Sequence, residues 1–319
     1  MSEASVPRLY VGTYTSKDSE GIYTCTFDPA TGDINAPVLA AKVEHPTFLA
    51  AHPRRPMLYA VCDAADAAGK TTGHAVAFET HPASGELARV AQQPTQGGRA
   101  CHVCVDTVAG NLLFADYGGG SAGVLPLDDE GRPEPVSAFH RFGPGSGIHE
   151  SRQSAPHAHS INLDPENRFA YVPDLGADRI YIFAFDAEGH DLRPAEPAWV
   201  ETAPGAGPRH MAFHPHAPYV FAINELNSTI VAYRRDLQNG LLEPVCQVST
   251  LPEGFEDHND CADIHVSSDG RFVYGSNRGH DSIVVYGFSP EKGLLSLVQR
   301  IGSGGQHPRN FALDPAERY

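Results

Sequence analysis

Four residues of the chain carry side chains suited to hydrolysis of an anionic substrate. They are His159, Arg209, Glu225 and Arg278. The planar guanidinium of Arg binds carboxylate or phosphate through two parallel hydrogen bonds, while His and Glu can move protons near neutral pH. The chain has a net charge of −16 and only 23 Lys plus Arg. An anionic substrate therefore has to be attracted by a local concentration of Arg, against the field of the whole protein.

These residues belong to a pattern that recurs about every fifty residues. Each copy has a polar start, a short apolar strand, a turn with Pro or Asp, and a second apolar strand with a polar end. Residues 159–172, 209–222 and 263–275 show it best. Repeats of this length made of short strands are typical of a β-propeller. We therefore predict an all-β protein, one propeller domain over residues 1–319 built of four-stranded blades. The predicted repeats are about 8–43, 44–98, 99–156, 157–206, 207–259, 260–305 and a partial 306–319.

The register of the repeats predicts where the four residues lie. Neighbouring strands of a blade are antiparallel, so the start of the first strand lies beside the end of the second. His159, Arg209 and Arg309 fall at first-strand starts, whereas Glu225 and Arg278 fall at second-strand ends. We predict that all of them gather on one rim. The predicted catalytic residues are His159, Arg209, Glu225 and Arg278, and the predicted substrate-binding residues are His157, His210, Asn224, Asp263, His265, Asn277 and Arg309. The alternative is that each residue only caps a turn or pairs with a neighbour.

Two further patterns could indicate a metal or redox site. Cys101 and Cys104 form a C-x-x-C, but they fall in a predicted strand, where residues three apart face opposite sides. We expect them to be buried and reduced. His157 and His159 place two imidazoles on one strand face, but a zinc site needs a third ligand at a defined spacing, and we find none. We predict no metal and no cofactor.

Composition excludes some partners. A net charge of −16 argues against nucleic acid, which is bound by clustered Lys and Arg. No apolar run approaches the roughly 20 residues that cross a bilayer, and residues 1–7 show no signal-peptide pattern. We expect a cytoplasmic protein that acts on a small molecule, without membrane or nucleic-acid partners.

At these motifs the chain resembles the seven-bladed propeller lactonases, the 6-phosphogluconolactonase family, whose relatives include a fungal carboxy-cis,cis-muconate cyclase. The matching stretches are Leu9–Tyr14, Pro156–Ser160, Gly207–Met211, Asn224–Ser228 and Ala262–His265. The resemblance implies that a His, two Arg and a Glu form the site, at His159, Arg209, Arg278 and Glu225. It also implies a seven-bladed propeller of which this chain lacks most of the last blade. Residues 309–314 then either pair with 9–14 or face a gap.

We therefore predict hydrolysis of a sugar δ-lactone, with 6-phosphoglucono-1,5-lactone as the first choice. Arg278 and Arg209 would hold the anionic substrate and stabilise the oxyanion. Glu225 or His159 would be the general base, and the residues leave that choice open. The alternatives are a muconolactone-type cyclase that uses the same Arg for carboxylates, and a binding propeller without chemistry.

Overall fold

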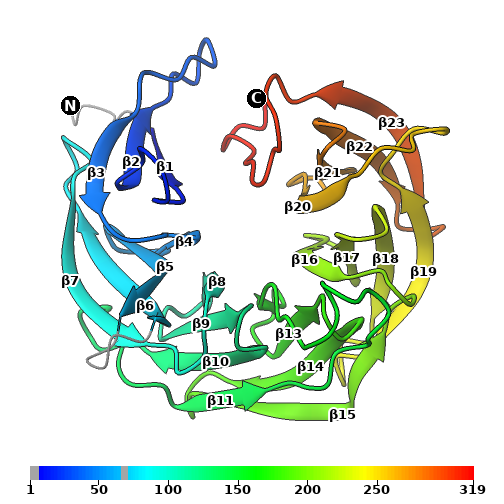
Figure 1. The fold of residues 1–319 in the computed structure, drawn as a ribbon, viewed down its shortest axis with the longest axis horizontal. Helices are drawn as coiled ribbons and strands as arrows, with labels where there is room; N and C mark the ends of the chain where they lie inside the picture. Colours follow the sequence, from blue (N-terminus) through cyan, green and yellow to red (C-terminus); the bar gives the residue numbers. More distant parts are fainter. Residues whose placement is uncertain (1–6, 66–70) are drawn as a thin grey trace. The chain divides into compact units, whose positions relative to one another are not determined.

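The structure is a computed structural model that describes residues 7–65 and 71–319 (Figure 1). Its described residues form six antiparallel sheets, five of four strands and one of three. The strands of each sheet follow one another in chain order, which is how a propeller blade is built. The predicted all-β propeller fold is thus confirmed, and each sheet lies within one predicted repeat. Among the described residues, no helix is long and apolar enough to span a bilayer.

The chain divides into two compact units. The first runs to Arg141 and includes Asp186–Leu192 and Tyr319, and the second contains Phe142–Phe185 and Arg193–Arg318. The sheets of the first unit are β1 (Arg8–Gly12), β2 (Gly21–Thr26) and β3 (Val38–Lys42); β4 (Phe48–Ala51), β5 (Met57–Ala65), β6 (Thr71–Thr80) and β7 (Leu87–Pro94); and β8 (Ala100–Val105), β9 (Asn111–Asp116), β10 (Ser121–Pro126) and β11 (Ala138–Arg141).

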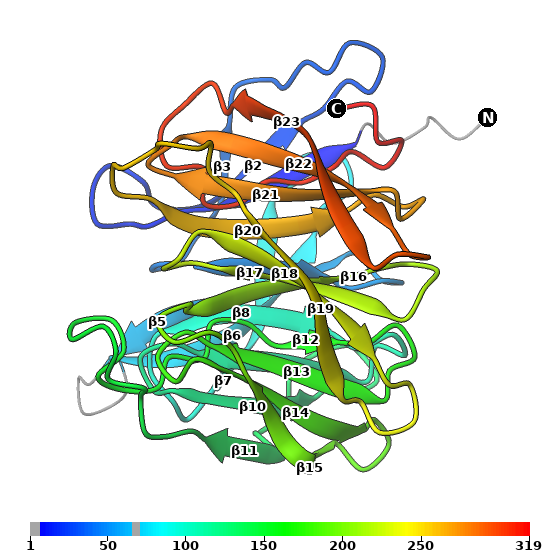
Figure 2. The same cartoon turned by 90° about the vertical axis from the view of Figure 1, so that its right-hand side faces the viewer.

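The second unit contains every predicted site residue. Its sheets are β12 (Asn162–Leu163), β13 (Phe169–Asp174), β14 (Arg179–Asp186) and β15 (Asp191–Glu201); β16 (Pro208–Phe213), β17 (Tyr219–Asn224), β18 (Thr229–Arg235) and β19 (Leu242–Ser249); and β20 (Asp260–Val266), β21 (Phe272–Arg278), β22 (Ser282–Ser289) and β23 (Leu294–Gly302). The fourth strands β19 and β23 are seen at the front in Figure 2. Residues 303–319 contain no strand, and the pairing or gap at 309–314 stays a prediction.

The second strand β17 is apolar up to its last residue because both of its faces are covered. In β17, Val220 and Ala222 pack against a cluster that includes Tyr171 of the preceding sheet. Phe221 and Ile223, which point the other way, pack against a cluster with residues of β21 and β22 in the following sheet. Alternation therefore produces an unbroken buried run rather than an amphipathic one. Burying one such side chain stabilises the fold by about 1.5–3 kcal/mol.

The first strand of several blades contains a β-bulge at the same place. Pro208 pairs with Asn224 and His210 with Ile223, so Arg209 is the extra residue. Similar shifts occur in β8, between Ala100 and His102, and in β20, between Cys261 and Ile264. A bulge re-aims side chains beside the end of the neighbouring strand. The repeat therefore carries a local device for presenting side chains at one end of each blade.

The C-x-x-C expectation is only partly met. Cys101 lies at the β8 bulge, where its Sγ donates to the carbonyl of Ala115 at 3.6 Å. Cys101 and Cys104 are half-buried rather than buried. No disulfide joins cysteines in the described parts of the chain.

Candidate active site

Arg209 and Glu225 form a buried ion pair where β16 starts and β17 ends. Arg209 Nε donates to Glu225 Oε2 at 2.9 Å, and both side chains are 2% exposed. The backbone amide of Glu225 donates to the carbonyl of Gly207 at 2.8 Å, which fixes the two strand ends together. A buried ion pair is tolerated only when its other donors and acceptors are satisfied as well. Arg209 Nη1 meets this condition by donating to the carbonyl of Ala262 at 2.6 Å.

Two further guanidinium groups contact Glu225. Arg278, the last residue of β21, places Nη2 2.9 Å from Glu225 Oε2 and donates to the carbonyl of Cys261 at 2.8 Å. Arg152 donates to the other carboxylate oxygen, Oε1. Its Nη1 lies 3.6 Å from Asp260 Oδ1. Glu225 thus contacts three guanidinium groups, one of which also lies near Asp260, and guanidinium groups gathered in this way are suited to binding an anion.

Arg152 is a further site residue that the repeat pattern does not predict. This residue lies between β11 and β12, in a segment without strands that the repeat pattern does not align. Its position therefore has no counterpart in the other blades. A long irregular segment inside a compact fold is itself a signal of function. That signal, combined with an Arg on the segment, could have identified it.

His159 and His210 lie beside the ion pairs. The ring centroids of the two histidines are 5.6 Å apart in an edge-to-face arrangement. His159 Nε2 is 3.8 Å from Glu225 Oε2. The predicted catalytic residues His159, Arg209, Glu225 and Arg278 are thus brought together at one end of their sheets, as the register predicted.

Asp263 orients His210, which in turn contacts Arg209. Asp263 Oδ1 lies 2.8 Å from His210 Nδ1, and His210 Nε2 lies 3.1 Å from Arg209 Nη1. The Asp263 carboxylate only accepts, so Nδ1 of His210 carries the proton and Nε2 accepts from Arg209. A chain of hydrogen bonds from β20 to β16 therefore fixes the guanidinium of Arg209.

Burial and charge shift the pKa values of these groups. Burial, with the charge of Arg209, lowers the pKa of His210 to about 4, and the pKa of His159 also falls well below its usual value because of burial and Arg209. Burial alone would raise the pKa of Glu225, but Arg209, Arg278 and Arg152 together lower it. Both histidines are therefore neutral and Glu225 is ionised near neutral pH.

Asp263 also ties the last segment of the chain to the site. Its Oδ2 accepts from Asn310 Nδ2 at 2.5 Å and from the backbone amide of Phe311 at 3.3 Å. His265 Nε2 lies 3.0 Å from the same oxygen, and the His265 ring packs edge-to-face on Phe311. Burial is the main cause that lowers the pKa of His159, His210 and Arg209, and the positive charge of Arg309 adds to it. The role of Arg309 in substrate binding stays a prediction.

The side chains of two predicted substrate-binding residues are buried in contacts within the protein. Asn277 is fully buried, and its amide donates to the Thr250 carbonyl and the Ser282 hydroxyl. Asn224, also buried, donates to the hydroxyl of Thr229 at 2.9 Å. The backbone amide of His157 donates to Asp174 Oδ1 at 2.7 Å, and the role of the His157 side chain stays a prediction. Asn224 and Asn277 each lie one residue before Glu225 and Arg278. Because successive side chains of a strand point to opposite faces, the two amides face the turn that follows the strand.

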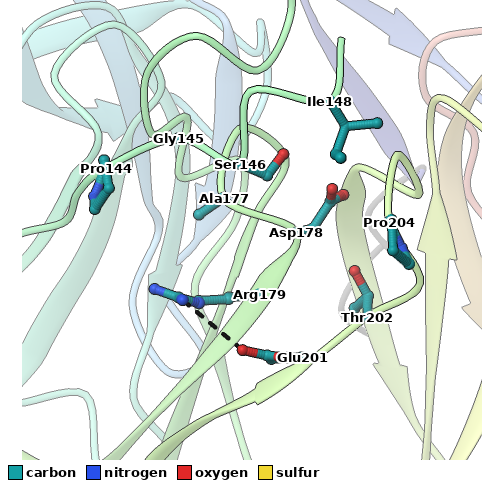
Figure 3. Close-up of a pocket in the computed structure, with 10 residues that line it drawn as sticks. All are labelled: Pro144, Gly145, Ser146, Ile148, Ala177, Asp178, Arg179, Glu201, Thr202 and Pro204. Atoms are coloured by element: carbon teal, nitrogen blue, oxygen red, sulfur yellow. Dashed lines mark ion pairs between the residues drawn. The ribbon is translucent and has the colours of Figure 1, made fainter.

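No group of three or more His, Cys, Asp or Glu side chains suited to a metal ion occurs within residues 7–65 and 71–319. A hollow of about 230 Å³ opens elsewhere on the second unit (Figure 3). Figure 3 shows Arg179 and Glu201 paired there, with Nη2 and Oε1 3.8 Å apart. None of the predicted site residues lines this hollow.

The fold is a β-propeller with an arginine-rich cluster at one end of its sheets, and comparison with known proteins identifies its family. Residues 8–319 match the family described as "Lactonase, 7-bladed beta-propeller". The chain therefore belongs to the seven-bladed β-propeller lactonase family.

Individual relatives cover nearly the whole chain. A 6-phosphogluconolactonase of Bacillus subtilis is 38% identical over 312 residues, which span 97% of this chain and 86% of the relative. A 6-phosphogluconolactonase of Formosa agariphila is 31% identical over 315 residues, with 98% and 87% covered. The solved structure of a periplasmic gluconolactonase of Pseudomonas aeruginosa is similar with a TM-score of 0.90, at 32% identity, with 98% of this chain and 87% of that chain covered.

Proposed function

We propose that this protein hydrolyses 6-phospho-D-glucono-1,5-lactone to 6-phosphogluconate without a metal or cofactor. The observation that carries the proposal is the convergence of three guanidinium groups on Glu225 beside a neutral, buried His159. A lactone has an activated carbonyl, so oxyanion stabilisation and one proton carrier suffice for its hydrolysis. The relatives named as 6-phosphogluconolactonases support the choice of substrate.

The three arginines differ in what they can do. Arg209 is fully buried, and its Nε and Nη1 are bonded to Glu225, His210 and Ala262. We assign it to holding Glu225 in place. Arg278 is more exposed and ends its strand, so it is the group that stabilises the oxyanion on the lactone carbonyl.

His159 is the general base in this proposal. Both oxygens of Glu225 are ion-paired with guanidinium groups, so the lone pairs that would accept a proton are already engaged. A neutral imidazole can take the proton of a water molecule as the water oxygen bonds to the carbonyl carbon. The tetrahedral intermediate then breaks its bond to the ring oxygen, which leaves with the proton from His159. Glu225 Oε2, 3.8 Å from Nε2, stabilises the transient imidazolium.

The test is an assay of acid release from 6-phosphogluconolactone, corrected for spontaneous opening, with a muconolactone as the competing substrate. The proposal expects faster turnover of the sugar lactone than of the muconolactone. His159→Gln should lower the turnover rate and remove the pH dependence due to the general base, whereas Glu225→Gln should keep that pH dependence. Turnover of the muconolactone alone would replace the proposal with the cyclase alternative. Turnover of neither would favour a binding propeller.

A further inference from the structure

We propose that Arg152 binds the phosphate group of the substrate and so selects the phosphorylated lactone over the unphosphorylated one. This inference rests on the proposed function, because it assigns a recognition role within the same site. The residue was not foreseen from the repeats, and it reaches the site from a segment without strands.

Arg152 is the most exposed of the three arginines that contact Glu225. The three guanidinium side chains on Glu225 are 2%, 14% and 29% exposed for Arg209, Arg278 and Arg152. A lactone that brings its carbonyl to the deeper groups keeps its remote end toward solvent. Arg152 is the member of the trio that this remote end meets.

The three guanidinium groups contact different oxygens of Glu225. Arg209 and Arg278 both contact Oε2, whereas Arg152 contacts Oε1. The carboxylate therefore separates the deep pair from Arg152. In the proposed substrate the phosphate is several bonds from the carbonyl, attached through the carbon on the other side of the ring oxygen. Two anion-binding places separated by a carboxylate fit a substrate with a developing oxyanion and a distant phosphate.

The segment that carries Arg152 is held in place before any substrate binds. The neighbour of Arg152, Gln153, is fully buried, and its Nε2 donates to the Leu175 carbonyl at 2.9 Å and to Asp178 Oδ1 at 2.7 Å. Gln153 Oε1 accepts from the backbone amide of His149 at 3.1 Å. The segment is therefore anchored one residue from Arg152. A guanidinium held in place loses less conformational entropy when it binds an anion.

Asp260 is the second carboxylate near Arg152. Its Oδ1 lies 3.6 Å from Nη1, which is longer than a hydrogen bond. A phosphate, with more negative charge than one carboxylate, can compete with Asp260 for Arg152. Removing the Asp260 charge should therefore strengthen discrimination.

The experiment measures kcat/KM for 6-phosphogluconolactone and for gluconolactone, and compares their ratio among variants. Arg152→Met should lower the ratio about 10- to 100-fold, the range for losing a charge-assisted hydrogen bond. Arg152→Lys should recover part of it, since the charge remains but the fork is lost. Asp260→Asn should raise the ratio about two- to fivefold.

Arg179→Met is the matched control. The Arg179 side chain is 27% exposed and pairs with one carboxylate, but it lines the separate hollow (Figure 3). It removes the same charge from a similar environment and should leave the ratio unchanged. An equal fall for both lactones in Arg152→Met would overturn the proposal, because Arg152 would then act only through Glu225.

Calorimetry separates this proposal from the proposed function. If the wild-type protein hydrolyses neither lactone, the proposed function fails, and binding of 6-phosphogluconate and gluconate still tests Arg152. The proposal then requires that the wild type bind the phosphorylated acid more tightly and that Arg152→Met reduce this preference. Equal affinities in the wild type would overturn it.

Discussion

The second unit contains two buried clusters of arginine and carboxylate at opposite ends of the same sheet, and they differ in stoichiometry. At one end of β16–β19, Glu225 holds three guanidinium groups. At the other end, Arg235 holds two carboxylates, with Nη1 3.3 Å from Asp164 and 3.1 Å from Glu166.

The carboxylates of the Arg235 cluster are tied into the fold by further contacts within the protein. Asp164 also accepts the backbone amides of Arg168 and Phe169, which closes a turn, and Arg235 stacks on the ring of Phe213. The Glu225 cluster has the opposite ratio, with three guanidinium groups on one carboxylate and Asp260 near one of them. The comparison teaches that burial of an ion pair alone does not mark a functional site, whereas guanidinium groups that outnumber the carboxylate they contact suit an anionic ligand.

The largest expected effect is on stability, at the Arg235 cluster. Arg235→Ala should lower the free energy of unfolding by about 3–5 kcal/mol, because it leaves the buried Asp164 without its cation. Denaturant unfolding measures the loss. Lactonase rate per folded molecule should stay at the wild-type level, and a specific loss of rate would break the distinction between the clusters.

The next effect is on catalysis, at the Glu225 cluster. Arg278→Ala should lower kcat/KM for the phosphorylated lactone on the order of a hundredfold, the scale for losing an oxyanion donor. Glu225 keeps its contacts with Arg209 and Arg152 in this variant, so the free energy of unfolding should fall far less than in Arg235→Ala. Arg278→Lys should recover only part of the rate, because the charge remains but the guanidinium fork is lost. A wild-type rate in Arg278→Ala would show that the cluster of guanidinium groups on Glu225 does not identify the site.

The pH profile should reflect the lowered pKa of His159. Burial and Arg209 keep the ring neutral below its usual pKa, so the general base remains available as pH falls through 6.5. An unperturbed His would retain about a quarter of its neutral form at pH 6. We expect more than half of the plateau kcat/KM at that pH. A midpoint of the acid limb at or above 6.5 would contradict the assignment of His159 as a buried base.

The smallest expected effect is that of chelation. Prolonged treatment with a chelator should leave kcat/KM unchanged, because the described residues offer no cluster of three metal ligands. The measurement compares treated and untreated protein, each with and without added divalent ion. Loss of activity that one ion restores would return His157 and His159 to consideration as ligands.

The sequence by itself determined the blades and the end at which the chemistry-bearing residues collect. Hydrophobic alternation and turn residues are local, and antiparallel pairing converts their spacing into a shared end. Arg209, Glu225 and Arg278 could therefore be placed together by counting from the repeat. The same counting could not separate Glu225 from Asn224, because adjacent strand-end residues differ only in where they point.

Only the tertiary structure decided the balance of charge and the roles within the cluster. Arg152 comes from a segment outside the repeat, so no periodicity relates it to Glu225. The bulge at Arg209 aligns its guanidinium with His210, and Asp263 from the next sheet fixes that ring. Protonation depends on burial and on neighbours from three sheets, which no single strand encodes. Local pattern thus determines where side chains start, and packing of distant segments determines which charges meet.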